Sequence, residues 1–361
     1  MKILLTTLGG YGDSLMLSMF AKRIKELYPE CSISVLGRKD TIHILDKNPN
    51  IDEIGVRYDF NDIPVLSNRF DAIIDSRYGV KTFYLKEPFD FDLTYDEILA
   101  RQKETELDLW VCDIIQYRAK LWVQNLQMLY DTNYFGDKET VNWYHIISYL
   151  SGINFTPNDL YIHQEGMTLP FEKGNYIAVS NMNDNRGYSK IYPPVHLNKV
   201  ISAFPNENFI ILGSHKNHLI AGKENIVNLE NKLNIFQTAY VIANSKFLLS
   251  DEGGLVHISK AVKKKSIVLF GSTQKWLFGY KDNINLTGDY NDCLYCHNQH
   301  PYWNMFCKLN GSRLYCKKLV SLNPEIVIQE IEKLCKTNDC GNLSKKHLIK
   351  PRYWDDIGMN L

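Results

Sequence analysis

The stretch Ser250–Thr273, SDEGGLVHISKAVKKKSIVLFGST, is the part of the chain that decides its fold class. The apolar run just before it, Phe247–Leu249, predicts a buried strand; Gly253 and Gly254 then lead into a helix, and Ser266–Phe270 predicts a second strand. A strand that delivers two glycines to a helix N-terminus presents free backbone N–H groups and the positive end of the helix dipole. The stretch therefore predicts either a phosphate site or an ordinary βαβ turn of an α/β protein.

An alternation of strands and helices runs through the first seventy-five residues and restarts in the second half of the chain. The first block opens with a predicted strand at Ile3–Thr7 and an amphipathic helix at Ser14–Tyr28, and the second block opens with a strand at Tyr176–Ser180. This alternation is typical of parallel sheets. We therefore expect an α/β fold of two facing Rossmann-like domains with a cleft between them, in which ligands bind at the carboxyl ends of the strands.

Changes of composition along the chain give the expected domain boundaries. Residues 1–165 are expected to form the first domain, with an aromatic-rich helical insertion at about 78–150. A linker leads to the second domain at 174–335, and the polar residues 336–361 form a C-terminal tail.

The bulk composition is that of an ordinary globular protein and excludes several classes of partner. The 361 residues include 41 Lys+Arg and 41 Asp+Glu, so the net charge is zero and no broad basic field favours nucleic acid. No apolar run approaches the roughly 20 residues of a transmembrane segment, and the short apolar N-terminus predicts a strand rather than a signal peptide. We expect a cytoplasmic protein, with peripheral contact at the inner membrane left open.

A glycine-rich loop, Gly9–Gly12, follows the first strand and precedes Asp13. A dinucleotide site would need a different glycine spacing and an acidic residue at the end of the second strand, where this chain has Gly37 and Arg38, so an NAD site is rejected. Asp13 is interpreted in two ways. A carboxylate at a helix N-terminus is stabilised as an anion, which suits a general base, and it also suits the N-cap of the helix Ser14–Tyr28.

Three segments, taken together, resemble the ADP-heptose glycosyltransferase family (glycosyltransferase family 9), which includes the lipopolysaccharide heptosyltransferases. They are GGYGDSLMLSMFAKRIKELYP at Gly9–Pro29, the Lys-x-Trp-Pro-like segment Ser189–Pro193 with Tyr192 in the aromatic place, and Ser250–Thr273. The last is similar to the family's Asp-Ser/Thr-Gly-x-x-His signature followed by a strand and Phe-Gly-x-Thr. The resemblance implies the GT-B fold of two Rossmann-like domains.

The resemblance also implies roles for particular residues. Asp13 matches the family's catalytic base, and Lys190 matches the lysine that neutralises the leaving diphosphate. The substrate-binding residues that it implies are Gly10, Gly12, Glu252, Gly253, Gly254 and His257. The chain departs from the signature at two positions, because the family's Asp falls on Glu252 and its Ser/Thr falls on Gly253. A hydroxyl contact to phosphate is therefore lost and a bare backbone nest is offered instead. Gly213-Ser214 also lacks a match for the family's ribose-binding carboxylate.

Four cysteines cluster in the second domain in the pattern C-x2-C-x10-C-x8-C: Cys293, Cys296, Cys307 and Cys316. Four thiolates can close a tetrahedral site for iron or zinc, and His297 or His300 could replace one thiol. The alternative is four reduced structural thiols. The family branch that glycosylates autotransporter proteins is similar here, with Glu-Gly-Gly-Leu-x-His and a later four-cysteine iron site. No Asp-x-Asp occurs near a strand end of the second domain, so no catalytic divalent metal is expected.

The resemblance, together with these residues, implies an inverting glycosyltransferase that moves a heptose from ADP-heptose to an acceptor hydroxyl. The acceptor is a protein Ser/Thr or a lipopolysaccharide-core sugar, and a homo-oligomer is compatible with the sequence. Two alternatives of the same fold remain, a nucleotide-sugar epimerase and a non-catalytic nucleotide-sugar-binding protein.

Overall fold

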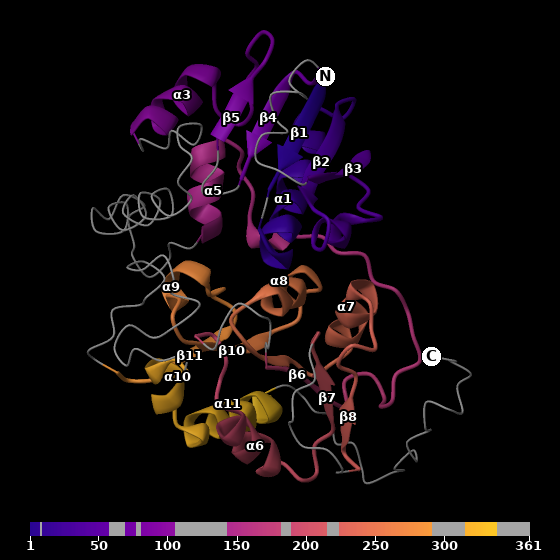
Figure 1. The fold of residues 1–361 in the computed structure, drawn as a ribbon, viewed down its shortest axis with the longest axis vertical. Helices are drawn as coiled ribbons and strands as arrows, with labels where there is room; N and C mark the ends of the chain where they lie inside the picture. The colour runs from indigo at the N-terminus through magenta and orange to yellow at the C-terminus, as the bar shows by residue number, and fades with distance from the viewer. Residues whose placement is uncertain are drawn as a thin grey trace.

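The computed structural model contains two parallel-stranded sheets, one in each half of the chain, each packed against helices (Figure 1). It describes residues 1–7, 9–57, 69–76, 81–104, 143–181, 189–214, 224–290 and 315–337. The α/β class expected from the sequence is confirmed.

The first sheet has the strand order β3-β2-β1-β4-β5. Its strands are β1 (Lys2–Thr6), β2 (Ser32–Arg38), β3 (Glu53–Arg57), β4 (Ala72–Asp75) and β5 (Lys81–Tyr84). All neighbours pair in parallel except β4 and β5, which are antiparallel. The expectation of helix from residue 78 onward is therefore wrong for β5, because a strand whose partner is β4 closes this edge of the sheet.

Helices and 3-10 turns cover one face of the first sheet, and some of them contact the second half of the chain. They are α1 (Tyr11–Leu27), α3 (Tyr95–Glu104), α5 (Trp143–Ser151) and the 3-10 turns η1 (Ile42–Leu45) and η3 (Pro157–Asp159). The apolar side chains of α1 are buried against β1 and β2, as in Leu15 and Phe20, which are fully buried. Figure 1 shows that α1 and α5 lie on the side of this sheet nearer the second half.

The second sheet has the strand order β11-β10-β9-β6-β7-β8, and every pair is parallel. Its strands are β6 (Ile177–Ser180), β7 (Phe209–Leu212), β8 (Ile226–Asn228), β9 (Leu248–Asp251), β10 (Ser266–Phe270) and β11 (Ile284–Thr287). In chain order this is the doubly wound 3-2-1-4-5-6 arrangement, whose direction of winding reverses between β6 and β9. Ligands of such sheets bind at the carboxyl ends of the strands that flank the reversal.

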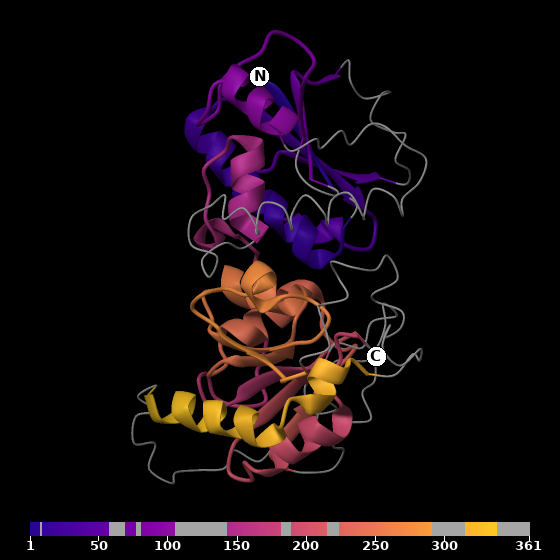
Figure 2. The same ribbon diagram turned by 90° about the vertical axis from the view of Figure 1, so that its left-hand side faces the viewer.

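Helices cover both faces of the second sheet (Figure 2). They are α6 (Pro194–Ser202), α7 (Ile235–Ala243), α8 (Gly254–Ala261), α9 (Lys275–Phe278), α10 (Lys317–Ser321) and α11 (Pro324–Thr337). Alternate residues of β6 separate two cores: Ala178 belongs to the core with α7 and α8, and Ile177 and Val179 belong to the core with α6, α10 and α11. The layer of α7, α8 and α9 thus faces the first sheet and its helices. Within the described ranges, no helix is both long and apolar enough to cross a membrane.

Candidate active site

The loop between β9 and α8 carries the glycines on which the sequence analysis is centred. Gly253 is the N-cap of α8, and no side chain caps the helix there. The first-turn N–H groups of α8 and its dipole are therefore available to an anion. A Cβ built on Gly254 would lie 3.2 Å from Cβ of Tyr11, so this helix N-terminus lies directly against the start of α1.

Lys190 and Glu252 form an ion pair beside this loop. The Lys190 Nζ lies 2.5 Å from Oε2 of Glu252, whose side chain is only 7% exposed. The Thr273 hydroxyl donates a hydrogen bond of 2.8 Å to the same oxygen. Burial raises the pKa of the Glu252 carboxyl, but the Lys190 ammonium and the Thr273 hydroxyl outweigh it and hold the pKa below its ordinary value. Glu252 is therefore an anion with two bonded partners, and it orients the Lys190 ammonium.

The segment that carries Lys190 is fixed by Tyr192 and Asp251. The backbone N–H of Tyr192 donates to Oδ1 of Asp251 at 3.1 Å, and the Tyr192 hydroxyl donates to the carbonyl of Leu322 at 2.9 Å. The Tyr192 ring is fully buried. A Cβ at Gly271 would lie 2.5 Å from the Ser189 carbonyl oxygen, so the segment packs directly on the end of β10. The aromatic residue of the Lys-x-Trp-Pro-like segment is thus an anchor for the lysine.

Asp13 lies in the first turn of α1. The helix begins at Tyr11, three residues before the predicted start, and Gly10 is its N-cap. Asp13 is not the N-cap; its Oδ2 accepts a hydrogen bond of 2.8 Å from the Gly10 N–H. A Cβ on Gly9 would lie 2.2 Å from the Asp13 carboxylate, so the glycine allows the loop to fold back over this side chain. The carboxylate therefore contributes to capping from inside the helix and keeps a fixed position.

The N-termini of α1 and α8 meet, which brings the two glycine loops together. A Cβ on Gly12 would lie 2.4 Å from Cδ2 and 2.9 Å from Nε2 of His257. The charges of Glu252 and Asp13 both act on the His257 imidazole. Residues from opposite halves of the chain thus surround one small region between α1 and α8.

Two tyrosines that the sequence analysis did not select complete this region. Nδ1 of His257 lies 2.6 Å from the hydroxyl of Tyr144 on α5 and 2.8 Å from the hydroxyl of Tyr280. The two tyrosine hydroxyls also hydrogen-bond to each other. Tyr144 lies 113 positions before His257, in the aromatic-rich insertion, and no local pattern in the sequence marks it.

Several buried polar side chains at the carboxyl edge of the second sheet lack a hydrogen-bond partner among the described residues. Ser180 ends β6, Ser189 precedes Lys190, and Ser272 and Gln274 follow β10. Each is less than 9% exposed. An unsatisfied buried polar group costs about 1–3 kcal/mol, so a polar ligand at this edge would relieve a real deficit.

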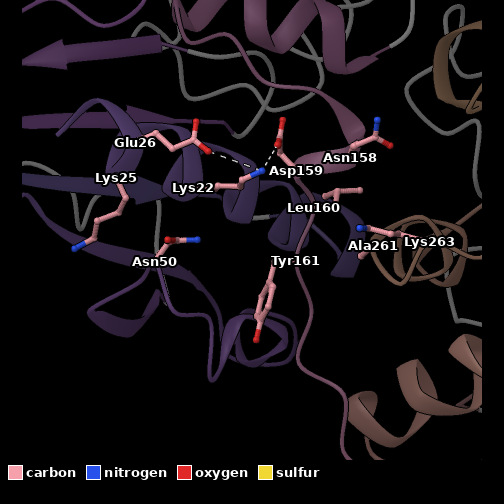
Figure 3. Close-up of a pocket in the computed structure, with 10 residues that line it drawn as sticks. All are labelled: Lys22, Lys25, Glu26, Asn50, Asn158, Asp159, Leu160, Tyr161, Ala261 and Lys263. Carbon is pink, nitrogen blue, oxygen red and sulfur yellow. Dashed lines mark hydrogen bonds and ion pairs between the residues drawn. The ribbon is translucent and has the colours of Figure 1, made fainter. Parts of the chain in front are cut away.

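A groove elsewhere in the molecule is distinct from this region (Figure 3). It has a volume of about 510 Å³ and its lining includes Lys22, Asn50, Asp159 and Lys263. Lys22 forms an ion pair with Asp159, so the lining is largely self-neutralised. Lys22 lies nine residues beyond Asp13 on α1, which is about 13 Å along the helix. The groove therefore does not contain the predicted site.

The cysteine cluster falls mostly outside the described residues. Cys293, Cys296 and Cys307 lie there, and Cys316 is described and buried immediately before α10. Within the part of the chain that the structure describes, no group of three or more potential metal ligands occurs. Lys317 hydrogen-bonds to the Tyr290 hydroxyl at 3.0 Å, so the two ends of the cysteine-bearing segment lie together.

Part of the chain is similar in sequence to a known protein family. Residues 162–302 match the sequence model of glycosyltransferase family 9 (heptosyltransferase). The matched region covers about two fifths of the chain and contains strands β6 to β11 with the loops that carry Lys190 and Gly253. The match supports a glycosyltransferase, and the GT-B fold implied by the motifs is confirmed. Among curated proteins, no sequence matches the chain.

Solved heptosyltransferases share the fold of this chain over most of its length. E. coli ADP-heptose lipopolysaccharide heptosyltransferase II matches with a TM-score of 0.56 and 15% identity over 92% of this chain and 98% of that one. E. coli heptosyltransferase WaaC with ADP matches with a TM-score of 0.53 and 15% identity over 92% and 100%. The iron-containing dodecameric glycosyltransferase TibC from enterotoxigenic E. coli H10407 matches with a TM-score of 0.57 and 13% identity over 92% and 76%.

Proposed function

We propose that this enzyme transfers a heptose from ADP-heptose to an acceptor hydroxyl, with inversion at the anomeric carbon. The observation that carries the proposal is the meeting of two loops: the uncapped N-terminus of α8 with the oriented Lys190 on one side, and Asp13 in the first turn of α1 on the other. Transfer from a nucleotide sugar needs both a cationic place for the leaving diphosphate and a carboxylate for the acceptor proton.

The donor assignment rests on the second half of the chain. Its sheet reverses winding between β6 and β9, and the α8 N-terminus follows β9. The unsatisfied hydroxyls of Ser180, Ser189 and Ser272 lie at the same edge and suit a phosphate or ribose. Two of the structural neighbours support ADP as the nucleotide, because one is named for ADP-heptose and the other was solved with ADP.

The reaction follows from these positions. The Asp13 carboxylate takes the proton of the acceptor hydroxyl, whose oxygen attacks the anomeric carbon. The bond from that carbon to the diphosphate oxygen breaks, and ADP leaves with the electron pair. The N–H groups of α8 and the Lys190 ammonium stabilise the charge that grows on the phosphate, which favours the transition state over the ground state. Because Oδ2 of Asp13 accepts from Gly10, Oδ1 is the oxygen assigned to the proton.

The four cysteines support a structural metal site and a particular branch of the family. Thiolates of Cys293, Cys296, Cys307 and Cys316 suit iron or zinc, and the pairing of Lys317 with Tyr290 brings the ends of their segment together. TibC is iron-containing and dodecameric, which supports iron and a homo-oligomer here. The similarity of the cysteine motif to the autotransporter-glycosylating branch favours a protein Ser/Thr acceptor over a lipopolysaccharide-core sugar.

The test is Asp13→Asn in the full-length protein, with ADP-heptose as donor and both acceptor classes offered separately. We expect ADP formation to fall by at least about a hundredfold, the usual contribution of a general base, with ADP affinity unchanged by calorimetry. Asp96→Asn is the matched control, since Asp96 is also a carboxylate in the first turn of a helix, α3. Transfer that survives in Asp13→Asn would reduce Asp13 to a capping residue.

Two further measurements separate the alternatives. An epimerase would isomerise the nucleotide sugar without releasing ADP, and a binding protein would do neither. Elemental analysis of protein purified without chelator should find stoichiometric iron or zinc that is lost in Cys316→Ser; substoichiometric iron and zinc in the unaltered protein would refute the metal site.

A further inference from the structure

Three polar side chains from both halves of the chain form a closed cluster behind the α1–α8 contact: Tyr144, His257 and Tyr280. The two tyrosines are 1% exposed each, and their rings stack with centroids 5.0 Å apart at 22°. Stacking places both hydroxyls at Nδ1 of His257, at 2.6 and 2.8 Å. Figure 1 shows where this crossing occurs, with α5 of the first half above α9 of the second.

Burial keeps both tyrosines protonated. The low polarity of their surroundings raises the pKa of Tyr144 and of Tyr280 well above the ordinary value of 10.0. Each hydroxyl therefore brings one proton to donate, and a buried O–H without an acceptor would be costly. Each of these two hydroxyl protons therefore needs an acceptor within the cluster.

The imidazole of His257 is neutral at pH 7. Burial lowers its pKa below the ordinary 6.5, and it outweighs the carboxylates of Glu252 and Asp13, which favour the charged form; the Lys190 ammonium lowers the pKa further. A neutral imidazole has one N–H and one accepting nitrogen. With Nδ1 as acceptor, the Tyr144 hydroxyl donates to Nδ1 and the Tyr280 hydroxyl donates to the Tyr144 oxygen, so both tyrosine protons are used.

We propose that Tyr144 and Tyr280 are positioning residues that hold His257 as the neutral tautomer with its proton on Nε2. That edge of the ring faces the first turn of α1, since a Cβ on Gly12 would lie 2.9 Å from Nε2. The N–H is therefore presented in the region between Asp13 and the α8 N-terminus. It is a hydrogen-bond donor for an anionic oxygen, which, on the proposed function, is a phosphate oxygen of the nucleotide sugar.

The cluster also makes the tautomer of His257 depend on contact between the two halves of the chain. Tyr144 belongs to α5 of the first half, whereas His257 and Tyr280 belong to the second. The neighbouring Trp143 packs across the same boundary on Phe278, with ring centroids 6.5 Å apart. The tyrosine pair that fixes His257 is thus complete only when α5 lies against the second half.

The experiment reads the tautomer directly, by long-range ¹H–¹⁵N NMR of full-length protein labelled with ¹⁵N-histidine, with His257→Gln to assign the signal. We expect His257 in the ligand-free protein to carry its proton on Nε2. Either tyrosine hydroxyl can donate to Nδ1 of His257. The single variants Tyr144→Phe and Tyr280→Phe each keep one such donor, so each should have nearly the same tautomer and ADP affinity as the unaltered protein. The double variant should give a mixture of tautomers and bind ADP about tenfold more weakly, which corresponds to about 1.4 kcal/mol.

Tyr176→Phe is the matched control, because this buried tyrosine also donates one hydrogen bond, to the carbonyl of Val241 at 2.6 Å, and does not touch His257. It should leave the tautomer and the ADP affinity unchanged. A proton on Nδ1 in the unaltered protein, or a double variant with wild-type tautomer and affinity, overturns the inference. If the double variant does not fold, the tautomer of the unaltered protein decides. If the unaltered protein binds neither ADP nor ADP-heptose, the proposed function fails while the tautomer still tests the positioning role.

Discussion

The contact between Gly12 and His257 is where a single methyl group should have the largest effect on this enzyme. An alanine Cβ at position 12 would lie 2.4 Å from Cδ2 of the His257 ring, well inside any normal carbon–carbon contact. The ring cannot move away freely, because Tyr144 and Tyr280 hold its other edge. The overlap must therefore be relieved by separating the first turns of α1 and α8.

The magnitude follows from two opposing effects. Overpacking by one methyl group in a tight contact costs about 1–3 kcal/mol. Replacing glycine by alanine in a helix returns at most about 1 kcal/mol. A 2.4 Å contact that the ring cannot relieve belongs near the upper end of the first range, so the net cost is about 1.4–2 kcal/mol. This corresponds to a loss of about tenfold to thirtyfold in the population of molecules in which the first turns of α1 and α8 are in contact.

Steady-state transfer, followed as ADP formation from ADP-heptose, measures this loss. We expect Gly12→Ala to lower kcat/KM by about tenfold to thirtyfold, with a small decrease in melting temperature. Gly166→Ala is the control, because a Cβ there has no neighbour closer than 4.0 Å. A Gly12→Ala enzyme with wild-type kcat/KM would refute the argument that the close approach of α1 and α8 is required.

Three other predictions concern the same site. Glu252→Gln removes the charge that neutralises Lys190, so ADP should bind severalfold more tightly by calorimetry; weaker binding would mean that orientation of the lysine matters more than its net charge. The lowered pKa of His257 means that the folded state disfavours protonation of its imidazole, so the free energy of unfolding is highest above about pH 6.5 and falls as the pH drops below that value. His257→Gln should reduce this fall when the free energy of unfolding is measured by urea titration at several pH values. An unchanged pH dependence would contradict the prediction. Tyr192→Phe leaves the buried carbonyl of Leu322 without its donor and should lower the free energy of unfolding by about 1 kcal/mol; no change would contradict the bond.

The strands that the sequence predicts most accurately are those buried on both faces. The predicted strand Ser266–Phe270 agrees with β10 at both ends, and Tyr176–Ser180 agrees with β6 to within one residue. Parallel strands covered by helices on both sides are continuous apolar runs, which a single sequence displays directly. The edge strands β3 and β5 were missed because EIGVR and KTFY mix polar and apolar residues, and their pairing with β2 and β4 is a tertiary effect.

The start of α1 shows why the site itself was only partly predictable. Aspartate is a favoured N-cap, so the sequence places the helix start after Asp13, but glycine is also accepted at the N-cap and Gly10 occupies it. The glycine loops around Asp13 and Gly253 could be found from the sequence pattern, and Lys190 was found through the family resemblance. The contacts of Tyr144 with His257 and Tyr280 join positions more than a hundred residues apart, and no spacing rule encodes them.

The two departures from the family signature are physically connected. Where the family has one Asp before a hydroxyl residue, this chain has two consecutive acids before Gly253, and the structure gives each a separate partner. Asp251, still within β9, accepts from the Tyr192 backbone and so fixes the segment, whereas Glu252 is one methylene longer and lies in the loop, where it pairs with the Lys190 ammonium. Thr273, in the loop after the neighbouring strand β10, also donates a hydrogen bond to Glu252. Glycine at 253 then leaves the α8 N-terminus without a side chain, so an anion can approach the backbone N–H groups directly, while both acids are engaged away from it.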